Sequence, residues 1–165
     1  MNECLIRHAR EVDLPAVRRI YNDAILHSTA VFIEAEADEE WARRWLSDHQ
    51  GARLALVADI DGEAAGWGSI SEFSSRCGYR FTGEVSIYID SRFRRRGLGE
   101  RLARALEEQA RRGGLHSLVA LIEASNAPSL RLFEKLGYEK AGLLREAGYK
   151  FGQWLSVAYY QKMLG

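Results

Sequence analysis

Hydrophobic and polar residues alternate along this chain with two periods, and their order predicts both helices and strands. The first clear pattern is helical: beyond a candidate cap at Asp13, five apolar residues recur at i, i+3, i+4, i+7 and i+8 and share one face, namely Val17, Ile20, Tyr21, Ala24 and Ile25. A second helix is expected from Asp38, where Trp41 and Trp45 lie one turn apart and are predicted to pack in the core. A short strand at residues 5–7 precedes both helices.

The middle of the chain switches to period two, which is typical of strands. Strands are predicted at residues 54–58, 64–70 and 82–89. A hairpin turn at Asp61-Gly62 joins the first two, and an irregular polar loop at 71–80 precedes the third.

The last third of the chain returns to a helix and then alternates. Leucines spaced by four predict a helix at residues 97–112, and Gly113-Gly114 ends it. The apolar run 118–122 is expected to be a strand covered on both faces, Asn126 to cap a short helix, and residues 155–164 to form a closing strand. This order predicts an α/β (α+β) fold, in which a mixed central sheet of about seven strands carries helices on both faces.

The composition is that of an ordinary globular protein. The 165 residues are 47% hydrophobic and 28% charged, and no repeat or linker divides them, so a single domain over residues 1–165 is expected. The formal net charge is zero, which argues against a nucleic-acid or membrane partner.

Location and metal content follow from what the sequence lacks. No apolar run approaches the length of a membrane span, and the N-terminus has no signal pattern, so the cytoplasm is the expected location. Cys4 and Cys77 have no metal-like spacing. We therefore expect neither a disulfide framework nor a metal.

The most informative segment joins the strand at 82–89 to the helix at 97–112 through an arginine-rich turn. Gly97-Leu98-Gly99 opens that helix, and free backbone N–H groups at a helix N-terminus form an anion site. Arg92 and the run Arg94–Arg96 suit a polyanion such as a nucleotide pyrophosphate. The dinucleotide fingerprint is excluded because Leu102 stands where it needs a third glycine. A plain turn with solvated arginines remains the alternative.

Two segments in register give the chain a resemblance to the GNAT (GCN5-related N-acetyltransferase) family. The loop Arg94-Arg95-Arg96-Gly97-Leu98-Gly99 resembles the family's Gln/Arg-x-x-Gly-x-Gly/Ala loop, which cradles the pyrophosphate of acetyl-CoA. Residues 126–138 resemble its Asn-x-x-(Ala/Ser)-x-x-x-(Tyr/Phe/His)-x-x-x-Gly-Phe segment. The resemblance implies the GNAT fold and acetyl-CoA as co-substrate.

A narrower resemblance is to the phosphinothricin and methionine sulfoximine acetyltransferase branch of that family. It rests on five short segments: Ile20–Ala24, Thr29-Ala30, Glu84–Ile89, Ile122-Glu123 and Lys150–Trp154. The branch implies a small amino-acid-like acceptor and a homodimer. Phe73-Ser74 depart from the Trp-Arg pair of many members, and Phe133 departs from the histidine that some carry.

The resemblance also implies which residues hold acetyl-CoA. Backbone groups of the strand at 82–89 would pair with the pantetheine arm, and the arginine-glycine turn would bind the pyrophosphate. Asn126 matches a cofactor-binding asparagine, although its role as a helix cap explains it equally well. The implied set is Ile87, Tyr88, Ile89, Arg94, Arg95, Arg96, Gly97, Leu98, Gly99, Glu100, Asn126 and Ser129.

Acetylation of an amine requires a base, because the amine of a free amino acid is mostly protonated at pH 7. Glu84 is the predicted base, and Ser86 is predicted to orient the acceptor or a water. The alternatives are a solvated carboxylate or an Arg80 salt bridge for the first, and an uninvolved strand serine for the second. Glu123 is a further candidate base, or a binder of the incoming ammonium group.

The group that protonates the departing thiolate is left open by the sequence. Many family members use a tyrosine for this step, and Phe133 at the matching position cannot replace it. Tyr88, Tyr138 and Tyr149 are candidates, and water is another because a coenzyme A thiol is fairly acidic.

The irregular loop before the strand at 82–89 is the predicted acceptor site, because such loops beside a rigid sheet often carry specificity. Arg76 and Arg80 favour an acceptor that bears a carboxylate over a cationic one. The predicted acceptor set is Phe73, Ser74, Ser75, Arg76, Tyr79, Arg80, Glu84, Val85, Ser86 and Glu123.

The function predicted from these residues is acetyl transfer from acetyl-CoA to the primary amine of a small amino-acid-like molecule, of the phosphinothricin or methionine sulfoximine type. A first alternative keeps the chemistry with a different acceptor, which is a peptide N-terminus, a polyamine or an aminoglycoside. A second alternative is a non-catalytic module that binds acyl-CoA or nucleic acid.

Overall fold

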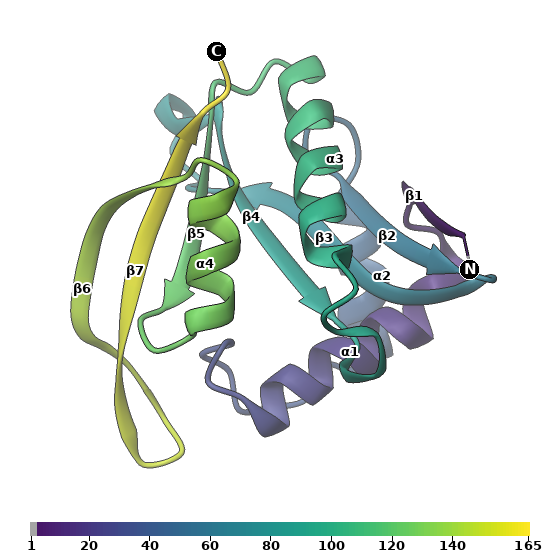
Figure 1. Cartoon of the computed structure of the whole chain (residues 1–165), viewed down its shortest axis with the longest axis horizontal. Helices are drawn as coiled ribbons and strands as arrows, with labels where there is room; N and C mark the ends of the chain where they lie inside the picture. Colours follow the sequence, from purple (N-terminus) through teal and green to yellow (C-terminus); the bar gives the residue numbers. More distant parts are fainter. Residues whose placement is uncertain (1–2) are drawn as a thin grey trace.

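A computed structural model describes residues 3–165 and shows one seven-stranded sheet (Figure 1). The strands are β1 (Cys4–His8), β2 (Ala55–Ile60), β3 (Glu63–Glu72), β4 (Thr82–Ile89), β5 (Ser117–Glu123), β6 (Glu139–Lys150) and β7 (Gln153–Met163), in the spatial order β1-β2-β3-β4-β5-β7-β6. The helices are α1 (Leu14–His27), α2 (Glu39–Asp48), α3 (Leu98–Arg112) and α4 (Ala127–Lys135). Short 3-10 turns lie at Glu11–Asp13, Cys77–Tyr79 and Ser91–Phe93.

Helices cover both faces of the sheet, as the sequence predicts. In Figure 1 α3 and α4 lie in front of the strands and α2 lies behind them. The front core contains Leu102 and Leu106 of α3 and Phe133 of α4. The rear core contains Val17 of α1 and Trp45 of α2. The fold class is therefore confirmed.

The sheet carries one feature that matters for function, which is the pairing of β4 with β5. These strands run parallel, and their register covers only Thr82↔Ser117, Gly83↔Leu118 and Glu84↔Val119. The remaining strand pairs in residues 3–165 are antiparallel. Beyond Glu84 the two parallel strands therefore diverge, and Figure 1 shows the gap between β4 and β5 widening towards the lower end of the sheet.

The predicted elements agree with the structure apart from two segments. The loop expected at 71–80 begins only after Glu72, where β3 ends, and its residues Cys77–Tyr79 form a 3-10 turn. At the C-terminal end the sequence bounded only the last strand, which pairs with a second long strand, β6. Most β6 side chains are exposed, so no apolar alternation marks this strand in the sequence.

The aromatic prediction for α2 is borne out for Trp45, whereas Trp41 is only partly buried. Trp45 is buried against Trp67 of β3, and Trp41 stacks on Tyr21 of α1 with 4.6 Å between ring centroids. Asp38 caps α2 by accepting a hydrogen bond from the Trp41 N–H at 2.8 Å. Within residues 3–165 no helix is long and apolar enough to cross a membrane.

Candidate active site

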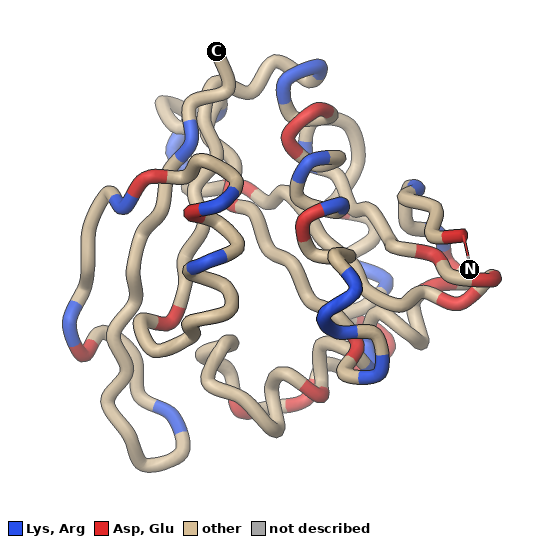
Figure 2. Tube along the Cα trace, in the orientation of Figure 1, with Lys and Arg blue, Asp and Glu red and all other residues tan. Residues whose placement is uncertain are grey.

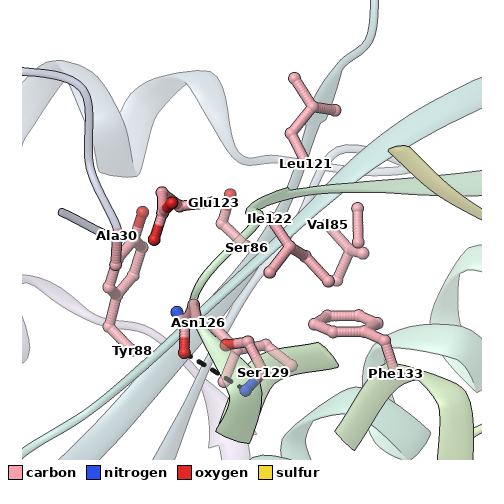
Figure 3. Close-up of a pocket in the computed structure, with 12 residues that line it drawn as sticks. Ala30, Val85, Ser86, Tyr88, Leu121, Ile122, Glu123, Asn126, Ser129 and Phe133 are labelled. Atoms are coloured by element: carbon pink, nitrogen blue, oxygen red, sulfur yellow. Dashed lines mark hydrogen bonds between the residues drawn. The ribbon is translucent and has the colours of Figure 1, made fainter. Parts of the chain in front are cut away.

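The divergence of β4 from β5 opens a cleft in the middle of the sheet (Figure 3). Each wall of the cleft is an uninterrupted stretch of one strand: residues 85–88 of β4 form one wall, and residues 120–123 of β5 form the other. The remaining lining comes from the loop after α1 and from α4: Ala30, Asn126, Ser129 and Phe133. Backbone groups that would pair in a continuous sheet face this cleft instead, so an extended ligand can hydrogen-bond to them as an added strand would.

Alternation along the strands separates the cleft lining into a polar and an apolar side. Ser86 and Tyr88 of β4 share one face of the sheet, on which Tyr88 packs against α1. Val85 and Ile122 face the opposite way, towards α3 and α4. Figure 3 shows this division, with Glu123 on the side of Ser86 and Tyr88.

The turn that leads from β4 into α3 is organised by a buried carboxylate. Asp90 accepts hydrogen bonds from the Arg92 N–H at 2.9 Å and from the Arg92 side chain, and Arg19 of α1 pairs with it at 2.5 Å. These partners, Arg92 first, hold the pKa of Asp90 well below its usual range. The Glu63 carboxylate forms a further ion pair with the same Arg92 guanidinium. Arg92 is therefore engaged in an ion-pair network with Asp90 and Glu63, contrary to its expected place in the anion site.

The N-terminus of α3 has the backbone geometry of an anion site. Gly97 has φ = +74°, a left-handed conformation that favours glycine, and Arg95 has φ = +61°. The first backbone hydrogen bond of the i→i−4 pattern in α3 runs from Arg101 N–H to Gly97 O at 3.1 Å. The N–H groups of residues 98–100 therefore have no acceptor within the helix and are available to a phosphate.

The arginines before α3 remain at the surface, where Figure 2 shows a basic run leading into the helix. Arg94 is tethered only weakly, at 3.5 Å to Ile89 O and 3.9 Å to Asp23. Arg96 lies over the Phe93 ring. Arg94, Arg95 and Arg96 are thus placed to add charge beside the free N–H groups.

Two members of the predicted cofactor set are used elsewhere by their side chains. Leu98 is buried in the front core. Glu100 pairs with Arg104 and with Lys135 of α4, which lowers the pKa of Glu100. Any contact that Leu98 or Glu100 makes with a phosphate therefore involves the backbone N–H and not the side chain.

Glu84 lies at the last paired position of β4, just before the strands separate. It is on the same face as Ser86, although the cleft lining begins one residue later, at Val85. Within residues 3–165 no hydrogen bond or ion pair holds its carboxylate; Arg80 donates to Cys77 O instead and lies over Phe81. The salt-bridge alternative for Glu84 is therefore wrong. Burial raises the pKa of Glu84, which makes the carboxylate more basic.

Glu123 differs from Glu84 because its carboxylate is already engaged. It is buried at the end of β5 and accepts hydrogen bonds from Ser125 N–H at 3.1 Å, Ser125 Oγ at 2.5 Å and Thr29 Oγ1 at 3.3 Å. Both oxygens of the Glu123 carboxylate therefore already accept hydrogen bonds from the protein. This geometry suits an ammonium-binding group better than a base.

Among the candidate tyrosines, only Tyr88 lines the cleft in the described part of the chain. Tyr138 is buried against Phe133 in the front core, and Tyr149 is exposed beside Trp154. Burial, with Tyr21 and Glu84 nearby, raises the pKa of Tyr88, so its hydroxyl remains protonated and able to donate near neutral pH.

Comparison with known proteins decides the family. The model of the acetyltransferase (GNAT) family matches residues 14–138. The chain belongs to this family. The L-methionine sulfoximine/L-methionine sulfone acetyltransferase of Pseudomonas aeruginosa is 39% identical over 158 residues, which covers 94% of this chain and 92% of the relative. The phosphinothricin N-acetyltransferase of Streptomyces viridochromogenes is 38% identical and covers 95% of this chain and 86% of that protein.

A solved structure agrees with the GNAT assignment in three dimensions. The yncA protein of Salmonella typhimurium, determined with its cofactor acetyl-CoA, superimposes with a TM-score of 0.96 at 34% identity, covering 99% of this chain and 95% of that one. The predicted fold, the enzyme class and the resemblance to the phosphinothricin and methionine sulfoximine branch are confirmed. The chain is an acetyl-CoA-dependent N-acetyltransferase by family, which disfavours the non-catalytic alternative.

The residues present fit acetyl-CoA at this GNAT site. The diverging strands offer unpaired backbone groups to the pantetheine arm, and the α3 N-terminus offers N–H groups and arginines to the pyrophosphate. Asn126 caps α4 by accepting from the Ser129 N–H at 3.4 Å, and both side chains also line the cleft. The cap and the cofactor role of Asn126 are thus compatible.

The predicted acceptor loop does not line the cleft. Phe73 and Tyr79 contact each other edge to face, with 5.5 Å between ring centroids, and Arg76 is exposed. None of Phe73, Ser74, Ser75, Arg76, Tyr79 and Arg80 is among the described cleft residues. The loop instead adjoins the end of β4 that carries Glu84, since Glu72 pairs with Gly83.

Sequence reasoning missed the part played by the opposite wall. Ala120, Leu121 and Ile122 form a continuous apolar run, which predicts a core strand and does not indicate that the run also lines a cleft. Thr29 and Ala30 stood out only through the branch resemblance, yet one bonds to Glu123 and the other lines the cleft. The divergence of two parallel strands leaves no pattern in the sequence of either strand taken alone.

Proposed function

We propose that this protein transfers the acetyl group of acetyl-CoA to the primary amine of a small amino-acid-like acceptor. The observation that carries the proposal is the cleft between β4 and β5, with Glu84 and Glu123 beside it. Bound acetyl-CoA supplies the thioester carbonyl that the acceptor nitrogen attacks. The names of the relatives at 38–39% identity support an acceptor of the methionine sulfoximine or phosphinothricin type.

In this proposal the protein has three tasks at the acceptor. Glu123 binds the incoming ammonium group, while Glu84 takes one of its protons, directly or through a water that Ser86 orients. An N–H of the unpaired part of β4 polarises the thioester oxygen. Tyr88 donates a hydrogen bond to the departing thiolate, and a water supplies its proton. The proposed chemistry uses no metal.

A panel of acceptors tests the proposal. The release of coenzyme A thiol would be followed with L-methionine sulfoximine, phosphinothricin, a peptide with a free N-terminus, spermidine and an aminoglycoside. We expect kcat/KM to be highest for the two amino-acid analogues. A preference for the peptide, the polyamine or the aminoglycoside would move the function to the alternative acceptors, and thiol release with none of them would refute it.

We further propose that the acceptor's carboxylate is attracted by the loop between β3 and β4. Arg76 is exposed there, and Arg80 lies over Phe81 with its guanidinium at 4.5 Å from the ring. Replacing both Arg76 and Arg80 with Ala should raise the KM of an amino-acid acceptor about fivefold, with little change for its amide, since exposed charges contribute modestly. Equal effects on acid and amide would contradict this role.

We also propose a cytoplasmic homodimer. Both cysteines are free, as expected in a reducing compartment. Exposed apolar side chains gather on β6 and β7, where Leu144, Tyr149 and Trp154 are at least half exposed, and such patches mark interfaces. Light scattering is expected to give twice the chain's mass of 18.7 kDa. A monomer over the assay's concentration range would remove the dimer from the proposal.

A further inference from the structure

Lys150 is a buried lysine that the chemistry described above does not use. It ends β6, in the segment 150–154 that resembles the branch, and none of its surface is exposed. Its Nζ donates hydrogen bonds to Ser28 O at 2.9 Å and to Val31 O at 2.7 Å. Burial lowers the pKa of Lys150, while the nearby Glu34 carboxylate opposes that shift. A buried ammonium group is costly unless it is bonded, so these carbonyls explain how it is tolerated.

The two carbonyls bracket the part of the chain that reaches the active site. Between them lie Thr29, which donates to the Glu123 carboxylate, and Ala30, which lines the cleft. These four residues follow directly after α1 and belong to no helix or strand; their local bonds run from Ser28 N–H to Ala24 O and from Ala30 N–H to Ser28 Oγ, both at 3.2 Å. A connecting segment of this kind is ordinarily mobile, so the bonds from Lys150 replace the order that a strand would supply.

Further contacts join the same two parts of the chain. A Cβ added to Gly148 would come within 2.5 Å of the Phe32 ring, so the backbone of β6 and that ring are in close contact. The Phe151 N–H donates to the Glu34 carboxylate at 3.4 Å. The β6–β7 hairpin therefore contacts the segment 28–34 at several points, although more than a hundred residues separate them.

We propose that Lys150 is a positioning residue for the acceptor: by fixing the carbonyls of Ser28 and Val31 it holds Thr29 and Ala30 at the cleft, and with them the orientation of Glu123. This inference rests on the proposed function, since it assigns Glu123 to the acceptor. It gives the β6–β7 hairpin a part in acceptor binding, without any contact between Lys150 and the substrate. The proposed acetyl-CoA contacts lie on β4, on α3 and at Asn126 and Ser129, to none of which Lys150 is hydrogen-bonded, so acetyl-CoA binding should change little.

The test compares Lys150→Met with Lys162→Met in the full chain. Lys162 is a second lysine of the hairpin, and its Nζ donates to Glu107 and to Leu136 O, both at 2.7 Å, far from the segment 28–31 in the sequence. Lys150→Met should raise the acceptor KM roughly tenfold, because small misplacements in an active site are costly, and leave the acetyl-CoA KM within about twofold. Lys162→Met should lower the melting temperature and leave both KM values unchanged.

Hydrogen exchange provides a readout independent of turnover. In Lys150→Met, the amides of Ser28 and Ala30, which donate to Ala24 O and to Ser28 Oγ, should lose protection while those of α3 keep it. Unchanged acceptor KM and unchanged protection in a folded Lys150→Met protein would overturn the proposal, and so would an equal rise of both KM values. If the wild-type protein acetylates none of the acceptors, the proposed function fails, while the exchange data still decide whether Lys150 orders the segment.

A second variant covers the case in which Lys150→Met does not fold. Gly148→Ala keeps Lys150 but pushes Phe32, the neighbour of Val31, out of its place. It should also raise the acceptor KM selectively, by roughly fivefold, since the displaced ring shifts the same segment. An acceptor KM equal to that of the wild-type protein, with the Ser28 and Ala30 amides as protected as before, would overturn the inference.

Discussion

Replacing Glu84 with Gln is expected to lower kcat by roughly a hundredfold to ten-thousandfold, the range in which a general base contributes. The amide has nearly the same shape but cannot accept a proton from the acceptor's ammonium group. Because the Glu84 carboxylate has no protein partner within the described residues, the substitution breaks no hydrogen bond. Steady-state kinetics at saturating acetyl-CoA and acceptor would measure the loss.

The pH dependence follows from the raised pKa of Glu84. A base must be ionised, so kcat should fall as the pH drops through the pKa of Glu84, which burial places above its ordinary value of 4.5. In Glu84→Gln this acid limb should disappear. Ionised Glu84 favours activity but weakens the fold. Because burial raises the pKa of Glu84 in the folded state, its contribution to stability is lost as the pH rises through that pKa. Glu84→Gln should therefore be at least as stable as the wild-type protein at pH 7.

Two other substitutions test whether Glu84, and not another glutamate, is the base. Glu139→Gln alters an exposed strand-end glutamate and should leave kcat unchanged. Glu123→Gln should act mainly on the acceptor KM, because that carboxylate is already bonded to Thr29 and Ser125. The assignment of the base would be wrong if Glu123→Gln abolished the acid limb while Glu84→Gln retained it.

Replacing Gly97 with Ala is expected to raise the acetyl-CoA KM about tenfold with little effect on the acceptor KM. Gly97 has φ = +74°, and an L-residue in this conformation is strained by roughly 1 kcal/mol. Relief of that strain turns the free N–H groups of residues 98–100 away from the pyrophosphate, whose binding depends on their direction. Isothermal titration with coenzyme A would measure the same loss without turnover.

Gly51→Ala is the matched control for this experiment. Gly51 has the same φ of +74°, and, as at Gly97, an added Cβ would meet no atom within 4 Å. Both substitutions should therefore lower the melting temperature by a similar amount, while only Gly97→Ala should weaken coenzyme A binding. Equal and small effects on binding would show that the α3 N-terminus does not hold the pyrophosphate.

Local chemistry explains why the proposed cofactor site could be predicted from the sequence. A strand, a glycine turn and a helix N-terminus are adjacent in the chain, so Arg94–Gly99 already describes the geometry that the structure shows. Asn126 is similar, because a helix cap is also local. In both cases the residues that form the feature lie within a span of six residues.

The acceptor side could not be found in this way because it is assembled from distant segments. Glu84 and Glu123 lie on different strands, and their surroundings depend on where β4 and β5 separate. The segment 28–31 is fixed by Lys150, which lies more than a hundred residues later. Arg92 illustrates the same limit: four arginines near one turn look equivalent in the sequence, but Asp90 and Glu63 neutralise this one.

The most direct test of the central claim is to incubate the purified protein with acetyl-CoA and L-methionine sulfoximine, and to measure thiol release and N-acetylated product together. We expect one molecule of N-acetyl product for each thiol released, saturation with both substrates, and loss of both signals in Glu84→Gln. Thiol release that does not depend on the amine, or an equally active Glu84→Gln protein, would contradict this claim.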